Sequence, residues 1–369
     1  MKVLVTGSGG FIGKNLVARL RRMDDVEILT HEKGDDESDL CRGLEAADFI
    51  YHLAGVNRPD DPEEFYRGNR DLTHRIVEIL QEKGKKTPIL FTSSIQVERE
   101  NDYGLSKKAA EEVLADYAEK SGATLFIYRL PNVFGKWSRP NYNTVIATWC
   151  HNLARDLPIE ISDENVELSL VYIDDVVDHF LRHLDDEVAK GVVYPHISPV
   201  YRKSLGEIRD LLQAFKTSRS TLVIPRVGRG FERALYATWL SFLPPEKFSY
   251  PLDGHRDERG TFYEFLKTMD SGQFSLSTTA PGVTRGNHFH HTKNEKFLVV
   301  KGRASIKMRQ LFTDEVIEFT VGDDRMEVVE MIPGYTHDIT NIGEEEMILM
   351  LWSNEIFDPE HPDTYYEKV

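Results

Sequence analysis

A glycine-rich turn between an apolar strand and a helix constrains the fold more than any other feature of the sequence. Residues 3–5 read Val-Leu-Val, residues 6–13 read Thr-Gly-Ser-Gly-Gly-Phe-Ile-Gly, and a helical pattern follows over residues 14–22. Gly7, Gly10 and Gly13 allow a tight turn, a close approach of the backbone to a pyrophosphate, and close packing of the helix on the strand. The helix N-terminus then offers unpaired N–H groups to phosphates. We therefore expect a nucleotide-binding site at this turn.

Strands and helices continue to alternate after the turn. Apolar strand patterns occur at residues 26–30, 48–53, 89–93 and 125–129, with helical patterns such as 71–83 and 107–120 between them. Strands that alternate with helices indicate a parallel, doubly wound sheet of the Rossmann type.

The residues after the second strand decide which cofactor fits. His31 and Lys33 favour the extra phosphate of NADP, whereas Glu32, if it turned inward, would favour NAD.

Residues suited to proton transfer follow the later strands. The strand at 89–93 is followed by Ser94, and Tyr103 and Lys107 stand four residues apart, on one face of a predicted helix. A lysine ammonium beside a phenol favours the phenolate and so lowers the pKa of the tyrosine. The tyrosine can then exchange a proton with a carbonyl oxygen while hydride moves, and Ser94 can hydrogen-bond the same oxygen. We interpret these three residues as catalytic.

The composition changes near residue 244, where helical patterns give way to short β-rich runs separated by glycine, proline and asparagine. We predict a first domain at residues 1–243, a linker at 244–252 and a second domain at 253–369. The predicted strands of the second domain are 273–278, 296–300, 304–310, 316–321, 326–332 and 347–352. Close-set strands of this kind are typical of an antiparallel sandwich or barrel.

Four potential metal ligands occur in the β-rich part. His288 and His290 alternate along one predicted strand, so both imidazoles should face the same cavity, and Glu295 and His337 complete the set. Imidazoles with a carboxylate suit Zn, Fe, Mn or Ni. His255 and His291 lack this context and are expected at the surface or behind the ligands.

Charge and composition restrict the partners. The 369 residues carry 45 Lys and Arg against 61 Asp and Glu, a formal net charge of −16 that disfavours nucleic acid and anionic membranes. No uncharged apolar run reaches the length of a membrane span, and no signal sequence is evident, so we expect a cytoplasmic protein. The two cysteines are too few for a disulfide framework.

Several motifs of the first domain resemble the extended short-chain dehydrogenase/reductases that act on nucleotide sugars. They are Thr6-Gly7-x-x-Gly10-Phe11-Ile12-Gly13, Leu53-Ala54-Gly55, Ser94, Tyr103-x-x-x-Lys107, Arg129-x-Pro131-Asn132-Val133-Phe134-Gly135 and Tyr172-Ile173-Asp174-Asp175-Val176. The resemblance implies a Ser/Tyr/Lys triad, cofactor contacts by Phe11, Ile12 and residues 53–55, and a lysine that also holds the nicotinamide ribose. It further implies that the region of Asn141, Tyr142 and Asn143 helps to bind cofactor and sugar nucleotide.

The histidine motifs of the second domain resemble those of cupins. A second resemblance, through residues 257–264 and 282–288, is to the sugar-nucleotide epimerases of the deoxysugar pathway, whose cupin barrel works without metal. In that family the histidine after the Arg-Gly pair is a base, so His288 has two competing roles, ligand or base. No clear equivalents of that family's orienting aspartate and acid tyrosine are present, which favours the metal interpretation.

Both halves together resemble the CapF family of bifunctional capsular-polysaccharide enzymes. The resemblance implies that a UDP-2-acetamido-2,6-dideoxy-4-hexulose is epimerised at carbon 3 by the cupin and reduced at carbon 4 with NADPH, to UDP-N-acetyl-6-deoxy-L-talosamine, on the way to N-acetyl-L-fucosamine. A divalent metal, best matched by Zn, and a homodimer are expected with it. Two alternatives remain: a single-function reductase with a structural, dimerising cupin, and a redox-sensing regulator that binds NADP without turnover.

Overall fold

The computed structural model describes residues 1–184 and 191–369. These residues form two compact units, the first made of residues 1–212 and 234–243 and the second of residues 213–233 and 244–369. No helix among the described residues is both long enough and apolar enough to cross a membrane.

A parallel sheet forms the centre of the first unit. Its strands lie in the order β2 (Glu27–His31), β1 (Lys2–Thr6), β3 (Phe49–His52), β4 (Ile89–Ser94), β5 (Thr124–Leu130) and β8 (Gly191–Val193). Every neighbouring pair is parallel, which confirms the predicted doubly wound sheet. The strand order reverses between β1 and β3, and in open α/β sheets ligands bind at the carboxyl ends of the strands beside such a reversal.

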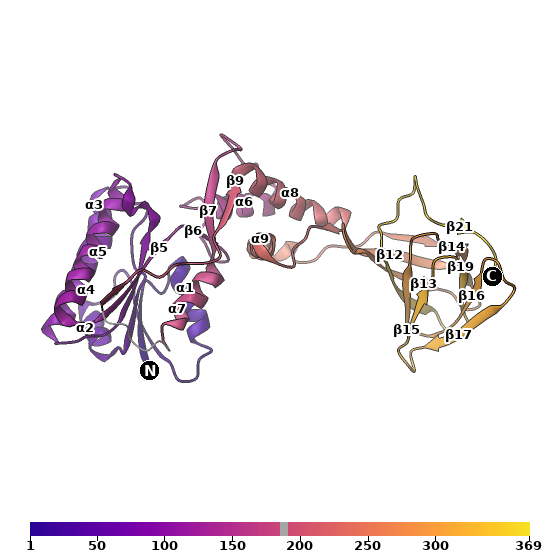
Figure 1. Ribbon diagram of the computed structural model, residues 1–369, viewed down its shortest axis with the longest axis horizontal. Coiled ribbons are helices and arrows are strands. Elements are labelled where there is room, and N and C mark those ends of the chain that lie inside the picture. Colours follow the sequence, from indigo (N-terminus) through magenta and orange to yellow (C-terminus); the bar gives the residue numbers. More distant parts are fainter. Residues whose placement is uncertain (185–190) are drawn as a thin grey trace. The chain divides into compact units, whose positions relative to one another are not determined.

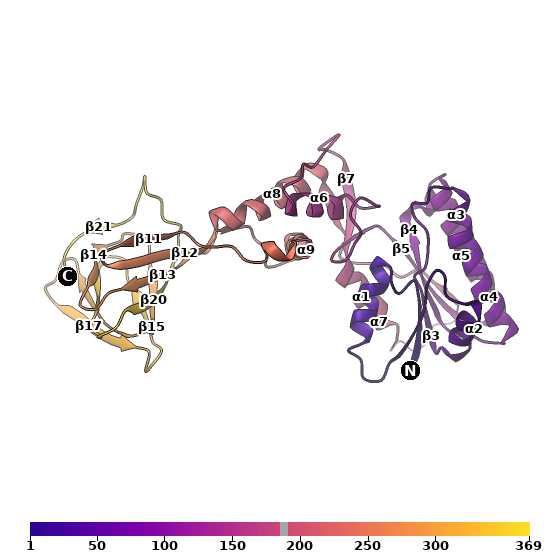
Figure 2. The ribbon, with the colours of Figure 1, turned by 180° about the vertical axis from the view of Figure 1, so that it is seen from behind.

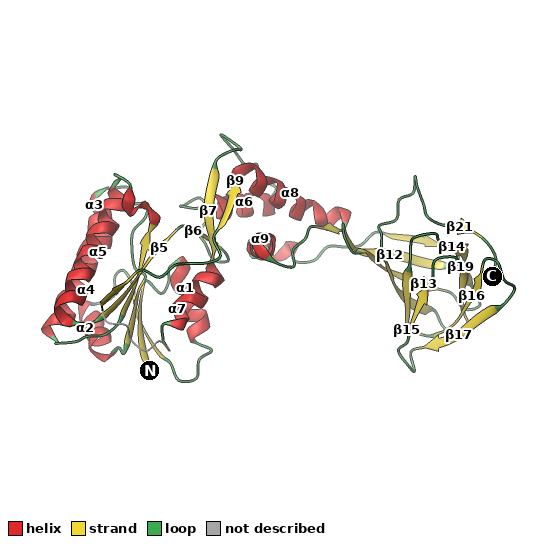
Figure 3. Ribbon diagram, in the orientation of Figure 1, coloured by secondary structure: helices red, strands yellow, loops and turns green. Residues whose placement is uncertain are grey.

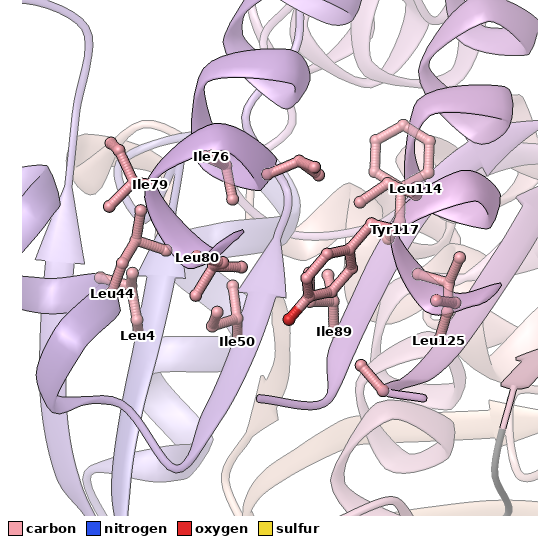
Figure 4. Packing of buried hydrophobic residues seen from close by; sticks show 14 of the residues in the cluster. Leu4, Leu44, Ile50, Ile76, Ile79, Leu80, Ile89, Leu114, Tyr117 and Leu125 are labelled. Carbon is pink, nitrogen blue, oxygen red and sulfur yellow. The ribbon is translucent and has the colours of Figure 1, made fainter. Parts of the chain in front are cut away.

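Helices cover both faces of this sheet. Figures 1 and 2 show α2 (Glu37–Ala46), α4 (Leu72–Glu82) and α5 (Asp102–Ser121) on one face, and α1 (Phe11–Leu20) and α7 (Ile173–Arg182) on the other. In Figure 4, leucine and isoleucine side chains of α2 and α4 and Tyr117 of α5 lie against apolar residues of the strands. Burial of this apolar surface is the main stabilising contribution.

One predicted helix is confirmed within a residue at each end, and a second begins earlier than its apolar pattern predicts. The pattern at 71–83 corresponds to α4, but α3 (Glu63–Phe65) and a π-helical segment, η1 (Tyr66–Asp71), precede it. The second, α5, begins at Asp102 rather than Lys107 because the Asn101 side chain accepts a hydrogen bond from the N–H of Gly104 and caps the helix. Tyr103 therefore lies in the first turn of α5.

Additional elements of the chain lie outside the parallel sheet. Strands β6 (Asn132–Phe134), β7 (Glu167–Tyr172) and β9 (Tyr201–Ser204) form a small sheet. The helical elements are η2 (Ile95–Glu98), α6 (Val145–Ala154), α8 (Leu205–Thr221), α9 (Gly230–Leu240) and η3 (Pro245–Lys247).

The second unit is rich in strands, as Figure 3 shows in yellow. One sheet has the order β10 (Val223–Ile224), β12 (Gly260–Thr268), β13 (Gly272–Thr279), β20 (Met347–Ser353), β15 (Glu295–Lys301) and β18 (Val328–Met331), with β11 (Gly254–Asp257) paired to β12. The other has the order β17 (Val316–Gly322), β16 (Arg303–Gln310), β19 (Tyr335–Asn341), β14 (Thr284–Phe289) and β21 (Tyr365–Tyr366). Apolar side chains of both sheets form one buried core.

Several strands of this unit are absent from the sequence prediction, among them β11, β12 and β21. Strand β19 is not among the predicted strands, because His337 and Asn341 occupy buried positions where an apolar residue would signal a strand. Strand β10 precedes the predicted linker, yet it pairs in parallel with β12 of the β-rich unit.

Candidate functional site

The glycine turn brings β1, β3 and α1 into close contact. Gly7 has φ +71°, and a Cβ atom there would lie 2.8 Å from the backbone nitrogen of Ala54. A Cβ atom on Gly13 would lie 2.1 Å from the carbonyl oxygen of Gly7. Gly10 is the N-cap of α1 and has no side chain to cap the helix, so N–H groups of the first helical turn remain available to an anion.

A cavity of about 980 Å³ lies at this edge of the parallel sheet. Its lining contains most of the predicted cofactor and catalytic residues, namely Gly7, Gly10, Phe11, Ile12, Gly13, Leu53, Gly55, Ser94, Tyr103 and Lys107. Ala54 contributes its backbone against Gly7. His31 and Lys33 are not part of the lining.

The tip of β2 is organised around Glu32. Its carboxylate accepts hydrogen bonds from the hydroxyl of Ser8, at 2.5 Å, and from the backbone N–H of Gly9. Lys33 is 91% exposed, and its Nζ lies 3.8 Å from a carboxylate oxygen of Glu64. The inward position of Glu32 is the arrangement that would favour NAD over NADP.

A buried histidine stabilises the residues behind the cofactor turn. His52 ends β3, and its two ring nitrogens lie 2.8 Å from the hydroxyl of Thr6 and 2.9 Å from that of Thr73. The Thr6 hydroxyl also accepts a hydrogen bond from the N–H of Ala54. Burial lowers the pKa of His52 to about 3, so the ring is neutral and can be both donor and acceptor. The sequence carries no distinctive signal for this role.

Ser94, Tyr103 and Lys107 converge in the cavity. Ser94 ends β4, where its hydroxyl accepts a hydrogen bond from the N–H of Gln96 at 3.2 Å and interacts with the phenol of Tyr103. Lys107 is buried on α5, and its Nζ donates to the carbonyl oxygen of Thr92 at 2.9 Å. Burial lowers the pKa of Lys107 to about 8. The spacing of residues 103 and 107 thus places both side chains beside the end of β4.

The pKa of Tyr103 differs from the sequence prediction. Burial raises it, and the interaction with Ser94 offsets only part of the increase. The predicted lowering by Lys107 is absent, since the lysine ammonium is bonded to the backbone of β4 instead. A phenol with a raised pKa retains its proton, which suits an acid that protonates a reduced carbonyl oxygen.

Asn69 supports the same region and is absent from the sequence prediction. It lies in η1, is 1% exposed, and exchanges two hydrogen bonds with the backbone of Val56. A Cβ atom on Gly55 would lie 2.7 Å from Oδ1 of Asn69 and 2.9 Å from Nζ of Lys107. The glycine therefore lets the loop after β3 pass directly over the lysine.

Cations line the other part of the cavity. Lys14, Arg99 and Arg139 all belong to the lining, whereas Glu167 is its one acidic member within the described residues. Tyr142 and Asn143 also line it, as the resemblance implies, but Asn141 does not. The cavity thus offers positive charge to an anionic ligand, although the chain has a net charge of −16.

The second unit brings the four predicted metal ligands together. Ligand atoms of His288, His290, Glu295 and His337 all lie within 4.8 Å of one another. His290 and His337 are almost fully buried, and their Nε2 atoms lie 3.3 and 3.6 Å from Oε2 of Glu295. Burial by itself raises the pKa of Glu295, but the hydrogen bond with His290 and the close approach of His337 and Lys293 lower it by more, so the net shift is downward.

The donor set fits a divalent cation. Both ring nitrogens of His337 are buried without a hydrogen-bond partner, and an unpartnered buried polar atom is costly unless a ligand satisfies it. Burial and the neighbouring histidines lower the pKa of His288 to about 4, so its imidazole is neutral, as a metal ligand must be.

The convergence of His288 and His290 arises differently from the prediction. Strand β14 ends at Phe289, so His290 lies beyond it, and Asn287 with φ +59° forms an irregularity within it. The two rings are nevertheless 5.0 Å apart between centroids. As predicted, His255 and His291 are exposed and lie outside the ligand set.

Comparisons with known proteins agree with both halves of the chain. Residues 3–194 match the NAD dependent epimerase/dehydratase family, and residues 255–365 match the polysaccharide biosynthesis C-terminal domain. The chain belongs to the NAD dependent epimerase/dehydratase family. This membership supports a nicotinamide cofactor in the first unit.

Two relatives extend the similarity to the whole chain. The UDP-2-acetamido-2,6-beta-L-arabino-hexul-4-ose reductase of Pseudomonas aeruginosa is 51% identical over 365 residues, which cover 99% of this chain and 98% of the relative. The crystal structure of the capsular polysaccharide assembling protein CapF from Staphylococcus aureus has a TM-score of 0.92 and 47% identity, with full coverage of both chains. The predicted resemblance to CapF is thereby confirmed.

A more distant neighbour agrees in fold. The UDP-glucuronic acid 4-epimerase from Bacillus cereus, solved with UDP-glucuronic acid and NAD, has a TM-score of 0.56 and 17% identity, and covers 66% of this chain and 99% of its own.

The packing of Gly13 against Gly7 generates a prediction for cofactor binding. The change Gly13→Ala places a methyl group in the space of a backbone carbonyl and should weaken nicotinamide cofactor binding roughly tenfold or more. Gly228→Ala is the matched control, since no atom lies within 4 Å of a Cβ there. Fluorescence titration with cofactor measures both. Equal affinities of the two variants would contradict this account of the turn.

Proposed function

We propose that a first domain of residues 1–243 reduces the carbon 4 ketone of a UDP-2-acetamido-2,6-dideoxy-4-hexulose with NADPH. The observation that carries the proposal is the convergence of Ser94, Tyr103 and Lys107 in one cavity beside the glycine turn. The cations of that cavity suit a nucleoside diphosphate, and the relative from Pseudomonas aeruginosa bears the name of a UDP-4-keto-sugar reductase.

The residues divide the reduction between them. Ser94 donates a hydrogen bond to the carbon 4 oxygen and orients the ketone, while NADPH supplies hydride to the carbon. Tyr103 gives its proton to the oxygen that becomes negative, so an alcohol forms without a free alkoxide. Lys107 binds the nicotinamide ribose, and the carbonyl oxygen of Thr92 holds its ammonium group in place beside the end of β4.

A second cofactor assignment is favoured by one observation. NADPH requires a cation at the tip of β2, and Lys33 supplies one at the surface. Glu32, however, already points at the glycine turn through Ser8 and Gly9, where it would accept a ribose hydroxyl of NADH. Binding of the 2′-phosphate of NADPH requires Glu32 to leave this position.

We further propose that residues 253–369 form a cupin that epimerises carbon 3, with 244–252 as the linker. His288, His290, Glu295 and His337 would hold a divalent cation, best matched by Zn because imidazole and carboxylate donors suit it. Such a cation would stabilise the negative charge of the enolate that forms when the ketone loses its carbon 3 proton. Removal of the carbon 3 proton and its return to the opposite face invert that centre without any redox change.

The product of both steps would be UDP-N-acetyl-6-deoxy-L-talosamine, a precursor for N-acetyl-L-fucosamine and capsular polysaccharide. A homodimer belongs to this proposal through the habit of cupins to pair. The alternative is a single-function reductase whose cupin only dimerises. Variants that lose reduction and epimerisation separately would distinguish the bifunctional enzyme from this alternative.

Two substitutions should separate the activities. Tyr103→Phe removes the acid and should lower ketone-dependent NADPH oxidation by about 10²- to 10⁴-fold, while epimerisation persists. His290→Ala should lose the metal and the epimerase activity, while the first unit still oxidises NADPH. NADPH absorbance, elemental analysis and NMR of the sugar measure these effects. Full metal retention by His290→Ala, or undiminished reduction by Tyr103→Phe, would overturn the corresponding assignment.

Substitutions at the tip of β2 should decide the cofactor. If NADPH is used, Lys33→Ala should raise its KM by roughly fivefold and leave the KM for NADH unchanged, because Lys33 is exposed and a solvent-exposed ion pair with the 2′-phosphate would contribute about 1 kcal/mol. If NADH is used, Glu32→Gln should raise the KM for NADH instead. Steady-state kinetics with both cofactors measures the ratio. Equal effects of Lys33→Ala on the two cofactors would contradict the NADPH assignment.

A further inference from the structure

The last residues of the chain lie directly beside the proposed metal ligands. Strand β21 (Tyr365–Tyr366) pairs with β14, so that Tyr366 lies opposite His288 and Tyr365 opposite Phe289. The Tyr365 ring also stacks on that of Phe289, with 5.3 Å between centroids. A segment more than seventy residues away in sequence thus pairs with the strand that carries His288.

Asp363 binds the loop that connects the proposed ligands His290 and Glu295. Its carboxylate accepts hydrogen bonds from the backbone N–H groups of His291, Thr292 and Lys293 at 2.9, 2.7 and 2.8 Å. The hydroxyl of Thr292 donates to the same carboxylate at 3.1 Å. These residues stand between His290 and Glu295, so one side chain determines the path of the backbone from one ligand toward the next.

The backbone of the same residue determines which nitrogen of His290 is free. The Nδ1 atom of that ring is hydrogen-bonded to the carbonyl oxygen of Asp363. A carbonyl oxygen can only accept, so Nδ1 must carry a hydrogen. The unprotonated nitrogen of the neutral ring is then Nε2, which faces Glu295.

Lys293 connects the tail to Glu295 itself. Its Nζ donates to the hydroxyl of Thr364 at 3.2 Å and lies 3.8 Å from Oε1 of Glu295. Both ligands at the ends of this loop are therefore tied to residues 363 and 364. Removal of a group that hydrogen-bonds a metal ligand typically lowers metal affinity by 10- to 100-fold.

We propose that the Asp363 side chain is a positioning group of the metal centre: by holding residues 291–293 it shapes the loop to Glu295 and keeps its own backbone carbonyl on Nδ1 of His290, which leaves Nε2 free for the metal. The inference rests on the metal site of the proposed function and adds that the C-terminal tail determines how well that site binds. The tail thereby completes a centre whose ligands all lie between residues 288 and 337.

Metal titration of the full-length chain tests this inference. Chelator-stripped protein is titrated with Zn²⁺ against a chromophoric chelator and with Co²⁺ by absorption spectroscopy. Asp363→Ala should bind Zn²⁺ roughly 10- to 100-fold more weakly and alter the Co²⁺ spectrum. Asp363→Asn should lose less, because its amide oxygen still accepts from the loop. Asp358→Ala is the control, since that carboxylate is bonded within the tail, to Glu360 and His361.

Each outcome decides the question. Wild-type affinity and an unchanged Co²⁺ spectrum in Asp363→Ala would overturn the inference, as would a lowered melting temperature of the metal-free protein with unchanged affinity. If Asp363→Ala does not fold, wild-type affinity in Asp363→Asn overturns it. Failure of the wild-type chain to bind either metal would overturn the metal site itself. That result differs from metal binding whose affinity does not change when residue 363 is substituted.

Discussion

Hydrogen bonding between β1, β3 and β4 sets the register on which the first site depends. Thr6 lies opposite His52, and His52 lies opposite Phe91, so the three strands end close together at one edge. The glycine turn follows β1 directly, the loop over Lys107 follows β3, and β4 continues past Phe91 to Ser94, so these groups meet without any long loop. Gly13 lets α1 close over the same edge, because any Cβ would collide with the turn. The register of the parallel sheet therefore determines which residues form the site.

Most of the first unit could be predicted from sequence because its signals are local. A strand, three glycines and a helix define the cofactor turn, and a four-residue spacing places Tyr103 and Lys107 on one helical face. The direction of the Tyr103 pKa shift could not be predicted, since it depends on burial and on the bond of Lys107 to Thr92. The inward turn of Glu32 likewise depends on a distant contact with Ser8 and Gly9.

The metal centre shows the same division. Its ligand types and spacing are visible in the sequence, and the structure brings all four together. The strand that carries His337 has polar residues at buried positions, so its sequence does not show the apolar alternation of a strand. The regular His-x-His spacing predicts a continuous strand, whereas β14 ends at Phe289. Asp363 could not be linked to His290 by any local pattern, because only the fold brings residues 290 and 363 together. Long-range contacts are thus what sequence periodicity leaves undetermined.

The two proposed steps share one chemical feature, the carbon 4 ketone, which acidifies the carbon 3 proton and then accepts hydride. The most direct test is solvent exchange: incubate the chain with the UDP-4-keto sugar in deuterated water, without nicotinamide cofactor, with and without a chelator, and follow carbon 3 by NMR. Deuterium uptake that the chelator abolishes is the predicted result. No uptake in a sample that still reduces the ketone once NADPH is added would contradict the epimerase assignment and leave the second unit a structural partner.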